Sequence, residues 1–208
     1  LGQLPETLPI NAWIYGSEIL PFFAVTERSY HDAARAEKAK AVFDRRIAFW
    51  RRLAADWPRP LRLIFVSRYA AEAAEQAVGA KIGRWLVQPT GIDQAMFPAR
   101  EKADEARYRI LSIRPFSDWR YANDLSVAAI LKLRGRPDFS RFQFHFVGDG
   151  HLFDEILAPV RDLPNVRCER RFVTQAEIAE LHAQNGVFLC PSRDDAQGVS
   201  RDEAMSSG

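Results

Sequence analysis

The chain has 208 residues, of which 47% are hydrophobic and 27% charged, and its formal net charge at pH 7 is +2. This length allows one large or two small domains, and the composition is typical of a soluble globular protein. A net charge this small gives no reason to expect nucleic acid as a partner. No apolar run approaches the roughly 18 residues of a membrane span, and no signal peptide is visible. Cys168 and Cys190 lie in apolar, strand-like runs, where reduced thiols fit a cytoplasmic protein.

The first half of the chain alternates short apolar runs with helical patterns. Strands are predicted at 10–15, 61–66 and 85–88, and helices at about 27–57 and 70–78. Strands and helices that alternate with short connections predict a parallel sheet with right-handed crossovers.

The long helical pattern at 27–57 has apolar residues at three- and four-residue steps and a basic polar face. Such a helix packs on a protein core through its apolar stripe, which is the first expectation here. A basic amphipathic helix also suits the surface of an anionic membrane, so peripheral contact with the inner face of a membrane is kept as the alternative.

A mixed-charge stretch at 97–106, which contains Pro98, is the predicted linker between a first domain at 1–96 and a second at 107–208. The second domain repeats the strand–helix order. Its predicted strands are 108–113, 142–147, 166–169 and 187–190, and its predicted helices include 125–133 and 153–157. Further helices are expected from Thr174, which has capping-box spacing to Glu177, and from about Val199. Asn123 or Asp124 is the expected N-cap of the helix at 125–133.

The last eighteen residues, 191–208, follow a predicted buried strand and read as a loop and then a helix. The loop would lie at the carboxyl end of its strand, where open α/β sheets bind ligands. Backbone N–H groups near Gly198 would face that crevice at the positive end of the helix dipole, which suits a diphosphate. Asp195 and Glu203 flank the helix start. Their carboxylates could accept hydrogen bonds from the neutral hydroxyls on the two sides of a diphosphate, which in a nucleotide sugar belong to a ribose and a hexose. The alternative is an ordinary helix N-terminus with acidic capping residues.

Two arginines, Arg114 and Arg120, follow the first predicted strand of the second domain. Guanidinium groups at the carboxyl end of a strand can neutralise a diphosphate and stabilise the charge that develops as it leaves. The alternative is that both are exposed loop arginines.

The C-terminal stretch resembles the acidic motif of the retaining glycosyltransferases of family 4, which have the GT-B fold. That motif has two glutamates separated by seven residues, a glycine between them, and E-A-M-x-x-G at its end. Asp195 stands at the position of the first glutamate and Glu203 at that of the second, while Gly198 matches the glycine. Arg114 and Arg120 match a family Arg and Lys at the same spacing, although Arg120 replaces the lysine and Ile113 replaces a usual glycine.

Three further segments resemble the same family. Gly148-Asp149-Gly150 is similar to its G-D-G turn, a weak signal by itself because tight turns favour these residues. Phe172-Val173 falls where the family lines the pocket for the nucleotide base, although a core or loop phenylalanine is an equal alternative. The segments 90–93 and 97–98 resemble the passage between its domains, so the resemblance covers about 66–208.

The resemblance implies an α/β protein with two Rossmann-like, parallel-sheet domains of GT-B type, both expected to be incomplete in this chain. It implies a glycosyltransferase that uses a nucleoside-diphosphate sugar, requires no cofactor or metal, and acts on an unknown glycan or lipid-linked acceptor. Arg114 and Arg120 would hold the diphosphate and Glu203 the ribose, with Asp195 and Gly198 at the sugar. Gln197, Val199, Gly148, Asp149, Phe172 and Val173 would complete the donor site.

The family's acceptor-binding domain carries a Gly-rich loop and a catalytic histidine, and neither is found before Arg114. We therefore expect this 208-residue chain by itself not to turn over. A non-catalytic module of the same fold, which binds a nucleotide sugar or acts as an interaction module, is the first alternative, and an epimerase or a phosphorylase of that fold is the second. His31, His145, His151 and His182 have no metal-ligand spacing, and His145 is expected to be a packed core residue. Neither a phosphate-binding G-x-x-x-x-G-K-S/T loop nor a G-x-S-x-G elbow is present.

Overall fold

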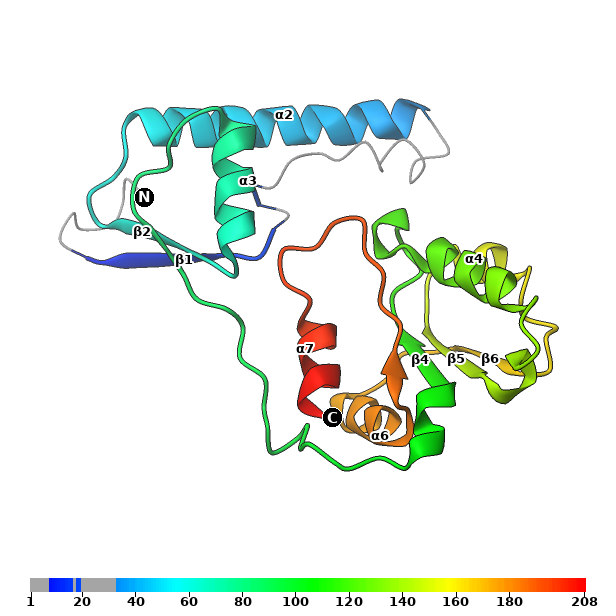
Figure 1. The fold of residues 1–208 in the computed structure, drawn as a ribbon. Helices are drawn as coiled ribbons and strands as arrows, with labels where there is room; N and C mark the ends of the chain where they lie inside the picture. Colours follow the sequence, from blue (N-terminus) through cyan, green and yellow to red (C-terminus); the bar gives the residue numbers. More distant parts are fainter. Residues whose placement is uncertain (1–7, 17, 20–32) are drawn as a thin grey trace. The chain divides into compact units, whose positions relative to one another are not determined.

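The computed structural model describes residues 8–16, 18–19 and 33–208 (Figure 1). The chain divides into two compact units. The first comprises Leu1–Thr90 together with Asp195–Gln197, and the second comprises Gly91–Asp194 together with Gly198–Gly208.

The first unit contains a parallel three-stranded sheet in the order β1-β2-β3. Its strands are β1 (Ile10–Ile14), β2 (Leu61–Phe65) and β3 (Trp85–Val87), and its helices are α2 (Ala33–Ala55) and α3 (Arg68–Val78). All five predicted elements are therefore confirmed, α2 over 33–55 only. Residues 27–32 and His31, on which part of the long helix prediction fell, lie outside the described residues.

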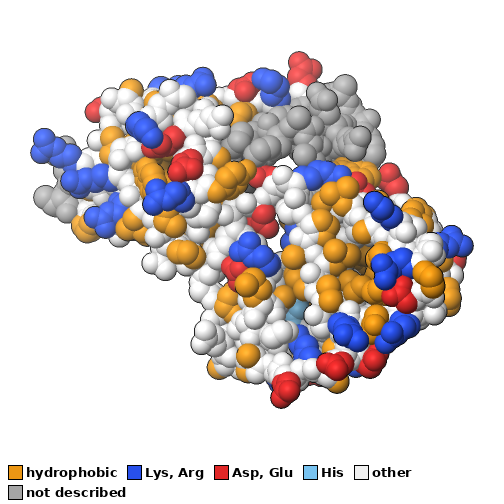
Figure 2. All heavy atoms as spheres, in the orientation of Figure 1, with side chains coloured by type: hydrophobic (Ala, Val, Ile, Leu, Met, Phe, Trp, Pro, Cys, Tyr) orange, Lys and Arg blue, Asp and Glu red, His pale blue; other side chains and the backbone are white. Residues whose placement is uncertain are grey.

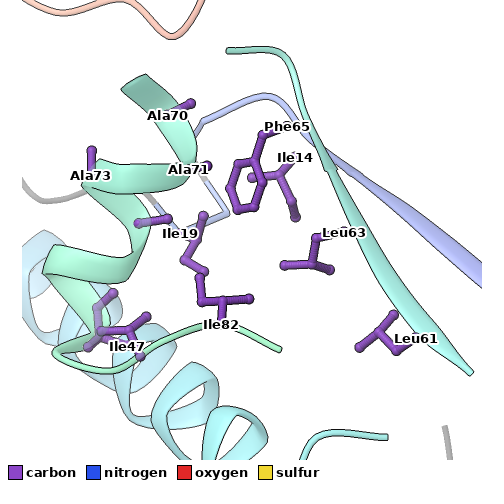
Figure 3. Packing of buried hydrophobic residues seen from close by; sticks show 12 residues of the cluster. Ile14, Ile19, Ile47, Leu61, Leu63, Phe65, Ala70, Ala71, Ala73 and Ile82 are labelled. Atoms are coloured by element: carbon purple, nitrogen blue, oxygen red, sulfur yellow. The ribbon is translucent and has the colours of Figure 1, made fainter. Parts of the chain in front are cut away.

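The core of the first unit lies between β2 and the two helices. Alternate residues of a strand face one side of the sheet, so Leu61, Leu63 and Phe65 are buried while Arg62 is exposed. Figure 3 shows Leu63 and Phe65 turned toward α3, where Ala70 and Ala71 allow a close approach. The apolar stripe of α2 packs on the same core, so the packing expectation for this helix is confirmed.

The ends of α3 explain its length. Ser67 is its N-cap, and the side-chain oxygen accepts a hydrogen bond from the N–H of Ala70 at 3.1 Å. Gly79 ends the helix with φ of 73°, a left-handed conformation that costs little only for glycine.

The second unit has a parallel four-stranded sheet in the order β6-β5-β4-β7. Its strands are β4 (Arg109–Ile113), β5 (Gln143–Gly148), β6 (Val166–Arg170) and β7 (Val187–Phe188). Its helices are α4 (Asn123–Leu133), α5 (Phe153–Leu157), α6 (Gln175–Gln184) and α7 (Val199–Ser206), with short 3-10 helices at Asp104–Tyr108, Trp119–Tyr121 and Phe139–Arg141. The predicted order of strands and helices is confirmed, although β7 is shorter than the predicted 187–190.

Helices cover both faces of this second sheet. One core cluster joins Phe144 and Phe146 of β5 to Val127 and Ile130 of α4 and to α5. The other joins Leu111 and Val147 to α6 through Ile178 and Leu181. A parallel sheet with helices on both faces is a doubly wound α/β arrangement, and its ligand sites lie at the carboxyl ends of the strands.

Two local predictions for the second unit are wrong and one is confirmed. The N-cap of α4 is Ala122 in a left-handed conformation with φ of 52° and no capping side chain, while Asn123 is the first helical residue and its side-chain amide donates to the carbonyl of Pro115 at 2.8 Å. His145 is mostly buried, with 15% of its side chain exposed, but its Nε2 lies 3.0 Å from Glu169 Oε1, so it pairs with a carboxylate and is not packed in the apolar core. The capping box of Thr174 and Glu177 is present as predicted.

The stretch predicted as a linker, 97–106, belongs to the second unit and contacts the end of α7. Phe97 is buried, its carbonyl accepts a hydrogen bond from Ser206 Oγ at 2.7 Å, and the N–H of Arg100 donates to Ser207 O at 3.2 Å. Over the described part of the chain, no helix has both the length and the apolar composition needed to cross a membrane.

Candidate functional site

The loops that follow β4, β5, β6 and β7 all leave the same edge of the second sheet, because its strands are parallel. Most of the residues singled out from the sequence lie in these loops or in the helix α7 that follows.

Arg114 directly follows β4 and is only 7% exposed. Its Nη1 donates to Ser200 Oγ in the first turn of α7 at 3.3 Å, and its Nη2 donates to the carbonyl of Pro191 at 3.4 Å. Its guanidinium carbon lies 5.2 Å from the centre of the Tyr121 ring. The Nε atom is buried and has no hydrogen-bond partner among the described residues. The alternative of an exposed loop arginine is therefore wrong for Arg114, which keeps unused hydrogen-bonding capacity.

Two glycines of the turn after β5 allow the loop that carries Arg114 to approach closely. A β-carbon on Gly148 would overlap the carbonyl oxygen of Arg114, and one on Gly150 would overlap the backbone of Phe116. Gly150 also has φ of 148°, which only glycine adopts readily. The N–H of Phe116 donates to the carbonyl of Asp149 at 2.8 Å. The G-D-G segment thus packs directly against the backbone of the Arg114 loop and helps to fix its position.

The Asp149 side chain faces β6 rather than Arg114. Its Oδ1 accepts hydrogen bonds from the N–H of Gly150 and from Arg170 Nε, both at 2.8 Å. The hydrogen bond from Arg170 and the backbone one lower the pKa of Asp149, so it stays ionised.

Arg120 lies in the same loop as Arg114, but its side chain is exposed. Its Nη2 lies 3.2 Å from Asp118 Oδ2. Its carbonyl accepts a hydrogen bond from the N–H of Arg193 at 2.9 Å. The loops after β4 and β7 therefore lie side by side, with Arg114 beneath them and Arg120 at the surface.

An ion pair fastens the loop after β7 to the start of α4. Arg193 donates from Nη1 and Nη2 to both carboxylate oxygens of Asp124, at 2.7 and 2.6 Å, and from Nη1 to the carbonyl of Trp119 at 2.8 Å. The hydrogen bonds from Arg193 lower the pKa of Asp124. A bidentate pair of this kind fixes orientation as well as charge.

Helix α7 begins at Val199, as predicted, with Gly198 as its N-cap and no capping side chain. The alternative of an acidic capping residue at this helix start is therefore wrong. The N–H groups of the first turn carry the positive end of the helix dipole, and Ser200 of this turn contacts Arg114.

Glu203 lies one turn into α7 and is 6% exposed. Burial raises its pKa, and the nearby charge of Asp202 adds to this. Gln175 Nε2 donates to Glu203 Oε1 at 3.4 Å, a long and therefore weak hydrogen bond. A buried carboxylate held this loosely can still accept hydrogen bonds from a ligand.

Phe172 and Val173 follow β6 and differ sharply in exposure. Phe172 is 91% exposed, so the alternative of a core phenylalanine is wrong for it. Val173 is buried against Leu111 and Val147. The exposed ring of Phe172, in the loop after β6, offers a surface on which a planar ligand could stack, whereas Val173 contributes to the core.

Asp195 and Gln197 belong to the first unit. Gln197 forms two hydrogen bonds with the backbone of Thr90, accepting from its N–H at 2.8 Å and donating to its carbonyl at 3.0 Å. Asp195 Oδ1 accepts from the N–H of Gln197 at 3.3 Å. The positions of these two residues relative to Arg114 and Glu203 stay a prediction.

Ser200, Tyr121 and the pair of Arg193 with Asp124 were not found from the sequence. Ser200 and Tyr121 contact Arg114, but neither stands at a spacing that distinguishes it from other polar or aromatic loop residues. Arg193 and Asp124 are 69 residues apart, and only the pairing of strands β4 and β7 brings them together. In the residues that the structure describes, no group of three or more His, Cys, Asp and Glu side chains is placed to hold a metal ion.

The sequence matches no protein-family model and no curated protein. Among solved structures it is similar to TarM of S. aureus, with 15% identity, a TM-score of 0.61, and coverage of 95% of this chain and 35% of that one. It is similar to WaaG, a glycosyltransferase involved in lipopolysaccharide biosynthesis, with 17% identity, a TM-score of 0.63, and coverage of 96% and 55%. It is also similar to the trehalose-6-phosphate synthase OtsA, with 11% identity, a TM-score of 0.60, and coverage of 94% and 49%.

The fold is that of the GT-B glycosyltransferases, with Rossmann-like units built on parallel sheets, as the sequence predicted. This chain spans about a third to a half of the length of the structures it matches. At these identities the likeness establishes the fold, and the reaction has to be argued from the residues of this chain.

Proposed function

We propose that this chain is the donor-binding part of a glycosyltransferase, which moves a sugar from a nucleoside-diphosphate sugar to an acceptor hydroxyl and retains the anomeric configuration. One observation carries the proposal. Arg114 is a buried cation with an unused Nε, and it contacts the first turn of a helix without a capping side chain at the carboxyl edge of the sheet. Guanidinium groups and helix N-termini both bind phosphate oxygens.

In this proposal the bond between the anomeric carbon and the diphosphate oxygen breaks, and the acceptor oxygen forms a new bond to that carbon. The leaving diphosphate takes the electron pair and the proton that the acceptor hydroxyl loses. The buried Arg114 and the exposed Arg120 both stabilise the negative charge on the leaving diphosphate. Cationic side chains and a helix N-terminus supply the positive charge, so no metal or cofactor is needed.

Glu203 is proposed to accept hydrogen bonds from the ribose hydroxyls. Its burial and its raised pKa show that the carboxylate pays a desolvation cost, which hydroxyl donors from a bound ribose would partly offset. Asp195 and the backbone at Gly198 are proposed to bind the sugar, and the exposed ring of Phe172 to stack on the nucleotide base.

The named relatives support a choice of nucleotide to test first. The S. aureus TarM structure is described as a complex that includes UDP, and a related E. coli structure as bound with UDP-2-fluoro glucose. We therefore propose a uridine nucleotide as the first donor to test, and synthesis of a glycan, polysaccharide or glycolipid as the role. The finer assignment to the retaining enzymes of family 4 rests on the acidic motif that ends at Glu203.

Contact with a membrane surface is proposed for the exposed face of α2. Val42 and Phe49 are exposed on it, together with Arg45 and Arg52, at three- and four-residue steps. Exposed apolar side chains between arginines suit the boundary of an anionic bilayer, and this would keep a cytoplasmic enzyme near a lipid-linked acceptor. Vesicle co-sedimentation tests it: Phe49→Ser should release the chain from anionic vesicles, whereas unchanged sedimentation would contradict it.

The proposed function is tested by titrating the 208-residue chain with UDP, GDP and ADP in a calorimeter. Binding of one nucleoside diphosphate that Arg114→Ala weakens supports a donor site, and absence of binding to all three contradicts it. The non-catalytic alternative requires a second measurement on the full-length protein. Transfer or hydrolysis of the sugar that Glu203→Ala abolishes supports an enzyme, whereas tight binding without either supports a binding module.

A further inference from the structure

Three arginines line a hollow of about 250 Å³ in the first unit, at the amino ends of its strands. Arg59, Arg62 and Arg84 share this lining with Asn11 and Pro60, and no lining residue is acidic. Figure 2 shows Lys and Arg side chains gathered over the end of the first unit that holds β1 and β2. Because ligands of parallel α/β sheets bind at the carboxyl ends, a basic hollow at the amino ends needs its own explanation.

The sheet brings Arg62 and Arg84 together. Arg62 pairs in register with Asn11 of β1, and the N–H of Leu63 donates to the carbonyl of Arg84 at 2.9 Å. Leu61 and Leu63 face the core, so Arg62 points to the opposite face of the sheet. Arg84 immediately precedes Trp85, the first residue of β3, which packs on the core, and Arg84 lines the hollow together with Arg62. Neighbouring strands are about 4.8 Å apart, so the backbones that carry the Arg62 and Arg84 side chains lie next to each other.

Arg59 reaches the same hollow from the loop before β2. It stands between Pro58 and Pro60, whose rings fix their own φ angles and restrict the residue before each proline to extended conformations. A short loop with two prolines has little backbone conformational entropy to lose when a ligand binds. The backbone position from which Arg59 reaches the hollow is thus largely set before any ligand binds.

The three guanidinium groups lack counter-ions among the described residues. None of them forms an ion pair with a described residue, whereas Arg161, Arg170 and Arg193 of the second unit all do. Like charges on adjacent strands repel one another and destabilise the sheet. An anion with several acceptor oxygens would relieve this repulsion and use the planar donors of arginine.

We infer that this hollow binds a phosphate group, carried either by a soluble phosphate or by the headgroup of an anionic lipid. A phosphate dianion presents enough oxygens to accept from Arg59, Arg62 and Arg84 at once, and the amide of Asn11 can donate a further hydrogen bond. The site differs from the proposed donor site, whose phosphate-binding residues lie in the second unit.

The test is a calorimetric titration of the chain with inorganic phosphate, for Arg62→Gln and Arg84→Gln against the unchanged sequence. Each substitution should lower the affinity at least about fivefold, which is about 1 kcal/mol. The matched control is Arg68→Gln, which removes the same charge from an exposed arginine just beyond the carboxyl end of β2. Its affinity should stay within about twofold of that of the unchanged chain. Equal losses in all three variants, or no phosphate binding at all, would overturn the inference.

Vesicles distinguish the two sources of phosphate. Phosphatidylcholine vesicles with and without phosphatidate are sedimented with the Arg62→Gln and Arg68→Gln chains, so that any contribution of α2 is the same in both. Weaker sedimentation of Arg62→Gln on phosphatidate vesicles alone supports a lipid headgroup. Equal sedimentation of the two variants, combined with the loss of inorganic phosphate binding in Arg62→Gln, supports a soluble phosphate.

Discussion

Gly148 at the end of β5 lies directly against the carbonyl oxygen of Arg114, so closely that a β-carbon on this glycine would overlap it. The glycine therefore determines where the loop after β4 runs, and with it the position of the buried guanidinium. The Gly148-Asp149-Gly150 turn is a weak signal in the sequence, but in the folded protein its first glycine is required for a steric reason.

Substitution of Gly148 by alanine should displace the Arg114 loop. We expect a loss of about 1–3 kcal/mol in the free energy of unfolding, the range for overpacking, together with weaker binding of a nucleoside diphosphate. Urea denaturation and calorimetry measure the two effects. Gly135→Ala is the control, because a β-carbon there meets nothing within 4 Å and should leave both quantities unchanged. Equal stability of the two variants would show that the loop can move aside without cost.

Removal of Arg114 or Arg120 should weaken the binding of a nucleoside diphosphate. Each alanine substitution is expected to cost about 1.5–3 kcal/mol of binding free energy, the range for hydrogen bonds to charged groups. The loss at Arg120 should shrink with added salt, because its side chain is exposed while that of Arg114 is buried. Arg136→Ala is the matched control, because Arg136 pairs with Asp138 two residues away, as Arg120 does with Asp118. Unchanged affinity in both Arg114→Ala and Arg120→Ala would refute the assignment.

Exchange of Asp195 for glutamate tests the departure from the acidic motif. Glutamate is longer by one C–C bond, about 1.5 Å, so its carboxylate would reach the position that the motif implies. We expect Asp195→Glu to retain or raise the rate of sugar transfer by the full-length protein. The same change at the exposed Asp162 should have no effect. A total loss of activity in Asp195→Glu would mean that the loop is built around the shorter side chain.

His182 should make the stability of the second unit depend on pH. It is 3% exposed, and its ring contacts the rings of Phe97 and Phe188. Burial, and then the charge of Lys102, lower its pKa to about 4 from 6.5. The unfolded chain therefore binds a proton at higher pH than the folded chain does. Stability is fully present above pH 6.5 and falls as the pH is lowered from 6.5 toward 4, by about 3 kcal/mol at most.

Urea denaturation across this pH window measures the effect. His182→Phe keeps an aromatic ring between Phe97 and Phe188 and should flatten the pH dependence, whereas His151→Gln, at an exposed histidine, should not. A steep dependence that persists in His182→Phe would assign it to carboxylates instead. Glu177, for example, has its pKa lowered to about 2 by hydrogen bonds from Thr174 and from Arg171, so its contribution is lost only as the pH falls from 4.5 toward 2.

The order of strands and helices follows from the sequence because it depends on local patterns. Short apolar runs predicted the parallel strands, and the spacing of Thr174 and Glu177 predicted a helix start that the capping box confirms. The candidate residues of the second unit could also be found, since Arg114 follows a strand and Glu203 stands at a fixed distance from Gly198. Periodicity and short-range hydrogen bonds act within a few residues, so a sequence displays them directly.

The tertiary structure decided which of these residues is buried and what each one contacts. Arg114 and Arg120 look alike in the sequence, yet one lies under the Pro191 loop and the other at the surface. Asn123 was expected to cap α4 but bonds the carbonyl of Pro115, because the folded loop offers it a partner that local geometry does not. Contacts such as that of Arg193 with Asp124 depend on strand order, which places distant segments within hydrogen-bonding reach and leaves no trace in the spacing of residues along the chain.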